Sequence, residues 1–273
     1  MAKLYVVGTP IGNLSDMSER AVNTLKEADF IAAEDTRVTL KLLNKFKIKN
    51  SLVSYHEHNR GIAGEQIVNR ILNGENCALV TDAGMPAISD PGEELVKLCR
   101  EKGVSVESVP GPTAFATAMA ISGMSSTRFT FEGFLSVTKR NRKEHLNSLK
   151  DEERTMIFYE APHKLIYTLK DMLAIFGDRE IAVCRELTKI HEQVINTTLQ
   201  KAVEKYENES PKGEFVLVIK GKEKSNEKEF TFEQAVEIAK DYHKNGEPLS
   251  AAAKLAASET GYKKSEIYKE LCK

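Results

Sequence analysis

Three loops rich in glycine and proline are the parts of this sequence best suited to bind a ligand. They span residues 8–14, 82–92 and 110–114, and each follows a short apolar run typical of a buried β-strand. Glycine lets a ligand approach the backbone closely, and proline fixes a turn without needing a hydrogen-bond partner. One such loop is consistent with an ordinary connection between strand and helix. Because α/β sheets bind ligands outside the carboxyl ends of parallel strands, three of them predict a binding site.

The loop sequences also argue against two common nucleotide sites. None has the G-x-x-x-x-G-K-[ST] pattern of a P-loop nucleotidase. Gly8 is followed by Thr9 and Pro10, so the first loop lacks the second glycine of a G-x-G-x-x-G motif, and an ordinary dinucleotide oxidoreductase fits poorly.

Titratable residues follow several of the predicted strands. Glu34 and Asp35 form one acidic pair, and Asp82 and Asp90 form another. Such carboxylates can orient a ribose or an amino group or accept a proton, and Asp35 and Asp90 can equally cap helices. His56 and His58 would point to the same side of a strand, but a metal site needs further ligands, so we expect a substrate-contact loop and no metal.

The second half of the chain offers three more candidate segments. Residues 158–164 combine an aromatic ring with titratable groups after a strand, and residues 185–189 follow the next strand. Glu186 and Lys189 can act in the site or form a simple helical surface pair. Residues 139–150 hold five Lys and Arg and one Glu, a local charge of +4. This basic segment is either a solvated loop or a contact for nucleic-acid phosphates.

The elements that must position these residues alternate between strand and helix. The pattern predicts an α/β fold with a mainly parallel sheet in residues 1–123 and a second α/β domain in residues 124–222. A charged linker at 221–228 precedes a helical extension at 229–273, with helices expected at 232–245, 250–259 and 264–272. The last two flank a turn with helix–turn–helix spacing.

Composition limits the class of protein. The 273 residues carry 39 Lys and Arg against 40 Asp and Glu, a net charge of −1, and 41% are hydrophobic. These values argue against a disordered chain and against an overall basic polymer binder. Four scattered cysteines do not form a disulfide framework. No apolar stretch reaches the roughly 20 residues of a membrane span and no signal peptide is recognisable, so we expect a soluble cytoplasmic protein without a membrane partner.

Six motifs, in this order along the chain, resemble those of the ribosomal RNA small subunit methyltransferase I family, a branch of the tetrapyrrole methylase superfamily. They are VGTPIGNL (7–14), AEDTR (33–37), TDAGMPAISDPG (81–92), PGPTA (110–114), FYEAPH (158–163) and RELTK (185–189). The resemblance covers about residues 1–222, and the last segment resembles a helical extension of some members. Met85 departs from the small hydroxyl residue more usual at that place.

The resemblance implies S-adenosylmethionine in a cleft between two α/β domains, 2′-O-methylation of a cytidine in 16S rRNA or the small ribosomal subunit, and a homodimer. It assigns cofactor binding to Pro10, Gly12, Asp82, Ala83, Gly84, Pro86, Pro110, Gly111, Thr113, Ala114, Tyr159, Glu160, Glu186 and Leu187.

A ribose hydroxyl is a weak nucleophile that benefits from a base. No spacing selects among the candidate bases Glu34, Asp35, His56, Glu160 and Lys164. We predict Glu34, Asp35 and Lys164 as the catalytic set, with the two carboxylates near the ribose and Lys164 on phosphate. The residues predicted to contact RNA are Arg37, His56, Lys139, Arg140, Arg142 and Lys143.

Two alternatives stay open at this point. The first is a tetrapyrrole C-methyltransferase of the same superfamily, although such enzymes usually carry a Gly-x-Gly-Pro-Gly-Asp type of first loop, and this chain has GTPIGN at residues 8–13. The second is a non-catalytic RNA-binding protein that uses the C-terminal helices.

Overall fold

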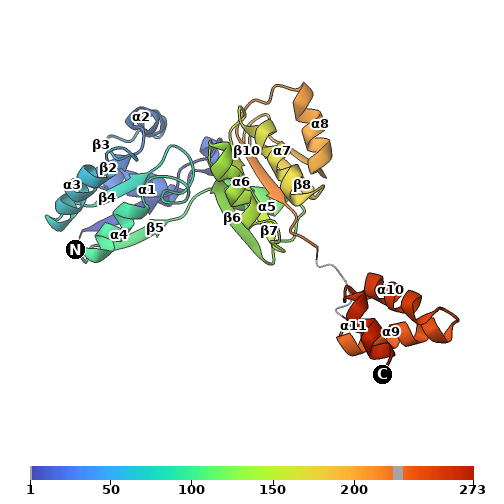
Figure 1. Ribbon diagram of the computed structural model, residues 1–273. Helices are drawn as coiled ribbons and strands as arrows, with labels where there is room; N and C mark the ends of the chain where they lie inside the picture. Colours follow the sequence, from blue (N-terminus) through green and yellow to red (C-terminus); the bar gives the residue numbers. More distant parts are fainter. Residues whose placement is uncertain (1, 224–229) are drawn as a thin grey trace. The chain divides into compact units, whose positions relative to one another are not determined.

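The computed structural model describes residues 2–223 and 230–273, which divide into two compact units at residues 1–222 and 223–273. The first unit contains two five-stranded sheets, and the second contains three helices (Figure 1). Most of the predicted linker at 221–228, and residue 229 of the predicted extension, lie outside the described residues. The division of residues 1–222 into domains at residue 123 stays a prediction.

The first sheet is entirely parallel, as the alternation of strands and helices predicts. Its strand order is β3-β2-β4-β1-β5. Strands β2 and β4 are buried along their whole length because helices cover both faces, which explains their continuous apolar sequence. The strands are β1 (Lys3–Val7), β2 (Phe30–Ala33), β3 (Leu52–Ser54), β4 (Cys77–Val80) and β5 (Ser105–Val109). The helices are α1 (Glu19–Glu27), α2 (Thr36–Lys45), α3 (Arg60–Leu72), α4 (Glu93–Glu101) and α5 (Ala114–Ile121), with the 3-10 turn η1 (Leu14–Asp16).

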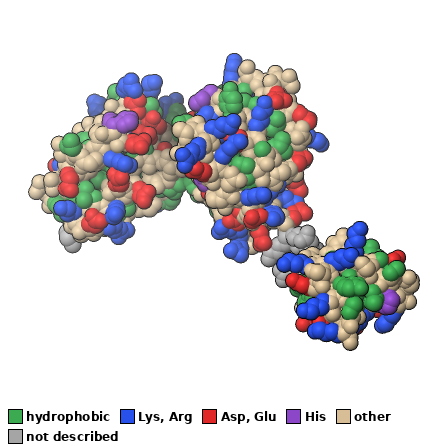
Figure 2. Space-filling view, in the orientation of Figure 1, with side chains coloured by type: hydrophobic (Ala, Val, Ile, Leu, Met, Phe, Trp, Pro, Cys, Tyr) green, Lys and Arg blue, Asp and Glu red, His purple; other side chains and the backbone are tan. Residues whose placement is uncertain are grey.

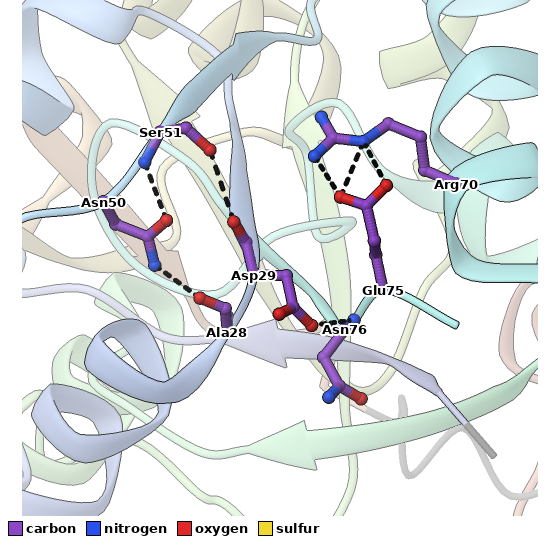
Figure 3. Close-up of polar contacts among 7 residues, drawn as sticks. All are labelled: Ala28, Asp29, Asn50, Ser51, Arg70, Glu75 and Asn76. Carbon is purple, nitrogen blue, oxygen red and sulfur yellow. Dashed lines mark hydrogen bonds and ion pairs between the residues drawn. The ribbon is translucent and has the colours of Figure 1, made fainter. Parts of the chain in front are cut away.

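Side chains tie together the loops that enter β2, β3 and β4 (Figure 3). Asp29 Oδ2 accepts a hydrogen bond from the Asn76 backbone N–H at 2.6 Å, and Asn50 Nδ2 donates to the Ala28 carbonyl at 2.7 Å. The Arg70 guanidinium pairs with Glu75 and lies 3.5 Å from the centre of the Phe30 ring. These contacts hold the amino-end edge of the sheet together, leaving the opposite edge to the Gly/Pro loops.

The second sheet is mixed, with strand order β6-β7-β10-β8-β9. Strand β6 is parallel to β7, and all other pairs are antiparallel. All five residues of the central strand β10 are buried. The elements are β6 (Phe129–Phe134), α6 (Lys139–Ser148), β7 (Thr155–Glu160), α7 (Leu165–Phe176), β8 (Glu180–Arg185), β9 (Gln193–Thr198), α8 (Leu199–Asn208) and β10 (Phe215–Ile219).

The sequence did not predict the helix α6, the strand β9 or the helix α8. Residues 139–148 look polar, but Arg142 and Leu146 are buried, so the segment is an amphipathic helix with a very narrow buried face. Strand β9 is an edge strand with no buried residue, and its hydrophobic pattern is accordingly weak.

The second unit is a small three-helix body with its own core. Helices α9 (Phe232–Lys244), α10 (Leu249–Thr260) and α11 (Lys264–Leu271) follow the predicted ranges to within one residue at each end. Ala235, Ala239, Ala253, Ala256 and Ile267 are fully buried among them. Gly261 ends α10 in the left-handed conformation, at a φ of 75°, which glycine adopts without strain. No helix of the described residues is long and apolar enough to cross a bilayer.

Candidate functional site

A cleft of about 380 Å³ lies between the two sheets of the first unit. It falls within the range of small-molecule sites, which is about 300–1,000 Å³. The lining residues from the first sheet and its loops are Ile11, Glu34, Asp82, Ala83, Gly84, Met85, Ile88, Ser89, Asp90, Thr113 and Ala114. Those from the second sheet and its loops are Phe134, Tyr159, Glu160, Ala161, Pro162, Leu187, Glu214, Phe215 and Val216.

The Gly/Pro loops form one wall of this cleft by packing directly on one another. Thr9 and Gly84 exchange backbone hydrogen bonds of 2.9 and 3.1 Å, and the Gly8 N–H donates to the Val109 carbonyl at 3.0 Å. A Cβ on Gly8 would lie 2.6 Å from the Gly111 backbone, so only glycine allows the loops to approach this closely. The three loops therefore meet at one sheet edge, as predicted.

The opposite wall is aromatic. The rings of Phe134 and Tyr159 lie edge to face with centroids 5.3 Å apart, and the ring of Phe131 lies 5.0 Å from that of Tyr159. The Tyr159 hydroxyl accepts the Phe115 backbone N–H at 3.1 Å, which fixes the ring against α5. Burial raises the pKa of Tyr159 above its usual value, so this phenol stays protonated near neutral pH.

Acidic side chains gather at one end of the cleft. The Thr81 hydroxyl donates to Glu34 Oε2 at 2.6 Å, and Asp82 Oδ1 accepts the Asp35 backbone N–H at 3.1 Å. Burial raises the pKa of Asp82, and the negative charges of Glu34 and Asp35 add to this effect. Burial, together with the charge of Glu34, raises the pKa of Asp90 to about 7.

The cleft contains many, but not all, of the predicted cofactor residues. Those that line it are Asp82, Ala83, Gly84, Thr113, Ala114, Tyr159, Glu160 and Leu187. Those that do not are Pro10, Gly12, Pro86, Pro110, Gly111 and Glu186. Gly111 supports the wall from behind through its contact with Gly8, and Gly12 packs against Thr188 and Lys189.

Of the predicted catalytic set, Glu34 alone lines the cleft. Asp35 caps α2, because its carboxylate accepts the Arg37 backbone N–H at 2.8 Å. Its hydrogen bonds with the Arg37 guanidinium lower the pKa of Asp35 to about 2. Such a carboxyl is a weak base. Lys164 pairs with the buried Glu160 at 3.4 Å and lies 5.8 Å from the centre of the Phe134 ring, at the rim of the cleft.

The predicted RNA-contact residues separate into exposed and buried groups. Arg37, Lys139 and Arg140 are exposed, and Lys143 is half-buried beside Asp171. Arg142 is buried, with its guanidinium 2.8 Å from the Asp171 carboxylate, because it links α6 to α7. We therefore withdraw Arg142 from the RNA-contact residues. Figure 2 shows Lys and Arg side chains on the surface of this part of the chain, around α6.

His56 lies after β3 and does not line the cleft. Its Nδ1 is buried and has no hydrogen-bond partner among the described residues, and its ring lies 6.0 Å from that of His58. Within residues 2–223 and 230–273, no three His, Cys, Asp or Glu side chains are grouped as metal ligands.

Several cleft residues were not on the predicted list. Ile11, Met85, Ile88 and Ser89 lie inside the Gly/Pro loops, so the motifs pointed to their segments but not to their side chains. Asp90 was recognised in the sequence as part of an acidic pair but not assigned to the site. Phe215 and Val216 reach the cleft because β10 pairs between β7 and β8, an antiparallel order that no local motif encodes.

A second hollow of about 240 Å³ adjoins the first loop and α2, and it shares Asp82 with the cleft. Its lining from α2 includes the apolar Val38 and Leu42 together with Lys41 and Lys45. We call this feature the α2 hollow. Arg37, Lys41 and Lys45 are spaced four residues apart, so they lie along one side of the helix.

Comparisons with known proteins identify the family. Residues 3–203 match the family model described as Tetrapyrrole (Corrin/Porphyrin) Methylases. A ribosomal RNA small subunit methyltransferase I from Synechocystis is 46% identical over 269 residues, covering 98% of this chain and 96% of that protein. The chain belongs to this family.

A relative with the same name, from Thermotoga maritima, is 47% identical over 223 residues, which cover 82% of this chain and all of that protein. Among solved structures, diphthine synthase matches with a TM-score of 0.63 at 15% identity, covering 81% of this chain and 90% of that one. Uroporphyrin-III C-methyltransferase from Thermus thermophilus, complexed with S-adenosyl homocysteine, matches with a TM-score of 0.58 at 18% identity, covering 80% and 97%. These two matches show that residues of this chain adopt the same fold as the two solved structures.

Proposed function

We propose that this protein transfers a methyl group from S-adenosylmethionine to the 2′-hydroxyl of a cytidine in 16S rRNA of the small ribosomal subunit. The observation that carries the proposal is membership, at 46% identity over nearly the full length, of a family whose members are named as small-subunit rRNA methyltransferases. We further propose that it acts in the cytoplasm as a homodimer.

The residues of the cleft fit S-adenosylmethionine. The molecule carries a positive sulfonium and an ammonium group, and the described lining contains five carboxyl groups and no Lys, Arg or His. Apolar side chains of Ile11, Met85, Leu187 and Val216 are suited to the adenine ring. When bound, the sulfonium supplies an already electrophilic methyl group, so the task of the protein is to align the acceptor and exclude water.

The first unit has cations on its surface and carboxyl groups inside the cleft. This distribution suits an RNA whose phosphates stay at the surface while one ribose enters the cleft. Lys41 and Lys45 line the α2 hollow together with Asp82, and Arg37 is exposed in the first turn of the same helix. Lys139 and Arg140 are exposed on α6. Phosphates can contact these cations, while the neutral ribose of one nucleotide reaches the carboxylates inside. Recognition of this kind uses a few placed cations and is compatible with a net charge of −1.

The same cleft makes the alternative substrate less suitable. A tetrapyrrole bearing several carboxylates would have to enter a lining whose described ionisable groups are five carboxyls and one phenol. Like charges at short range in a partly desolvated cleft repel strongly.

Methyl transfer from radiolabelled S-adenosylmethionine tests the choice of substrate. We expect label on the 16S rRNA of small subunits that lack the modification, and none on uroporphyrinogen. Label on uroporphyrinogen alone would establish the tetrapyrrole C-methyltransferase instead. Binding of RNA without binding of the cofactor, measured by calorimetry, would indicate a non-catalytic RNA-binding protein.

A further inference from the structure

Asp90 lies in a loop whose backbone is held in an unusual conformation. Ala87 and Ser89 have φ values of 66° and 63°, in the left-handed region that non-glycine residues rarely adopt. The loop ends at Gly92, which begins α4 with a φ of 146°. Such conformations persist only where the surrounding structure enforces them, and they cluster at functional sites.

Strand β6 of the second sheet packs against this loop. Strand β6 has a register shift between Phe131 and Gly133, and Gly133 has a φ of 62°. A Cβ on Gly133 would lie 2.9 Å from Ser89 Oγ, so the glycine lets β6 approach the loop just before Asp90. The residue just before Asp90 therefore lies against β6 of the second sheet.

Carboxylates surround Asp90, and no cation among the described cleft residues offsets them. The groups that face it are Glu34 after β2, Asp82 after β4 and the Tyr159 phenol on β7, with Glu160 and Glu214 further along the lining. Glu160 and Glu214 have their own cations, Lys164 and Lys189. The Thr81 hydroxyl, just after β4, donates its proton to Glu34 Oε2 at 2.6 Å, which holds the Glu34 carboxylate on this side of the cleft.

We propose that Asp90 is the general base of the reaction, accepting the proton of the ribose 2′-hydroxyl, and that Glu34 tunes Asp90 through its charge. This assignment rests on the proposed function. As the methyl carbon bonds to the ribose oxygen and its bond to sulfur breaks, the hydroxyl proton passes to Asp90 Oδ. The positive charge of the sulfonium and the negative charge of the carboxylate are both neutralised.

The other candidate bases are less well placed. Asp35 is outside the cleft and bound to Arg37. Glu160 is only 2% exposed, with its oxygens occupied by the Ala161 N–H and the Thr168 hydroxyl. A base works best when its pKa lies near the working pH, and Asp90, with a pKa of about 7, meets that condition.

The test compares Asp90→Asn, Glu34→Gln and the wild-type protein by the pH dependence of kcat/KM on small subunits. The exposed Glu65 on α3 provides a matched control, Glu65→Gln. We expect wild-type activity to rise with pH as Asp90 becomes a carboxylate, at or below the value of about 7 for the protein without cofactor, because the positive charges of the cofactor favour the carboxylate. Asp90→Asn should lose about 10²–10⁴-fold. In Glu34→Gln the pH at which kcat/KM rises should move to a lower value, whatever the maximal rate, because a negative charge near Asp90 has been removed. Glu65→Gln should match the wild type.

Thermal unfolding gives a second readout that does not depend on turnover. Because folding raises the pKa of Asp90 from its usual value near 3.8 to about 7, its ionisation destabilises the fold increasingly between these pH values. Asp90→Asn cannot ionise. The melting temperature of Asp90→Asn minus that of the wild type should therefore increase as pH rises from 4 to 7. Above pH 7 this difference should stay constant.

The outcomes separate the two proposals. If the wild-type protein methylates small subunits and Asp90→Asn is equally active, the assignment of Asp90 is wrong while the proposed function holds. Loss of turnover in Glu34→Gln at every pH, with Asp90→Asn active, would make Glu34 the base. If the wild-type protein transfers no methyl group to small subunits, the proposed function itself fails, whatever the unfolding curves show.

Discussion

Two aspartates near the same sheet edge illustrate how environment sets chemistry. Asp35 binds a guanidinium and accepts a backbone N–H, so the pKa of its carboxyl falls to about 2. Asp90 is partly buried beside Glu34, so the pKa of its carboxyl rises to about 7. In the sequence, both aspartates follow predicted strands and look alike. Only their three-dimensional environments show that Asp35 caps a helix and that Asp90 is a candidate base.

The role of Asp35 can be tested with two substitutions. Asparagine is as good a helix cap as aspartate, whereas alanine is not. We expect Asp35→Ala to lower the melting temperature, and Asp35→Asn to retain most of the stability at pH 7. The charged Asp35 carboxylate stabilises the folded protein above about pH 4. This stabilisation is lost as pH falls towards 2, because the pKa of Asp35 is lower in the folded state than in the unfolded state.

Methyl transfer by the same two variants provides the functional measurement. Neither should show the loss of about 10²–10⁴-fold that follows removal of a general base. Equal, large losses in both Asp35→Asn and Asp35→Ala would restore Asp35 to the catalytic set.

The sequence predicted the loops of the candidate site better than its side chains. Glycine and proline motifs mark segments directly, which is why residues 82–84 and 113–114 were found. The cleft positions of Phe215 and Val216 depend on pairing between β10 and two distant strands. Arg142 was misassigned because its partner, Asp171, lies 29 residues away on α7. Such long-range contacts leave no local pattern.

At the scale of elements, the close approach of the first and third loops depends on two glycines. We expect Gly8→Ala to cost about 1–3 kcal/mol and to weaken cofactor binding, because the new Cβ would meet the Gly111 backbone at 2.6 Å. Chemical denaturation and calorimetry measure the two effects. Gly61→Ala is the matched control, since nothing lies within 4 Å of its added Cβ, and it should be neutral or stabilising by about 0.4–1 kcal/mol. A Gly8→Ala protein as stable as Gly61→Ala would contradict this account of the loop.

Helix α2 offers a second test at this scale. Replacing Lys41 and Lys45 together by alanine should weaken RNA binding and lower the slope of log affinity against log salt by about one per lysine. Affinity for S-adenosylmethionine should not change, because neither lysine lines the cleft. The paired control replaces Lys97 and Lys102, exposed on and just beyond α4. An unchanged salt slope in the α2 variant would remove the α2 hollow from the RNA-binding surface.

At the scale of the whole molecule, the proposed chemistry belongs to residues 1–222. Both sheets and the complete cleft lie there, and the Thermotoga maritima relative of the same name matches over all of its length with 223 aligned residues. The alternating pattern predicted the first sheet and the three C-terminal helices well, because their apolar periodicities are local. The mixed second sheet was harder to predict, since its order follows from antiparallel pairings between distant segments.

Mass-spectrometric mapping of ribose methylation tests the central claim most directly. Small ribosomal subunits that lack the modification are incubated with S-adenosylmethionine, with and without the protein, and the 16S rRNA is then digested and analysed. We predict one new 2′-O-methylcytidine that appears only when the protein is present. Absence of any new methyl group, or a methyl group on a base in place of the ribose oxygen, would contradict the proposed function.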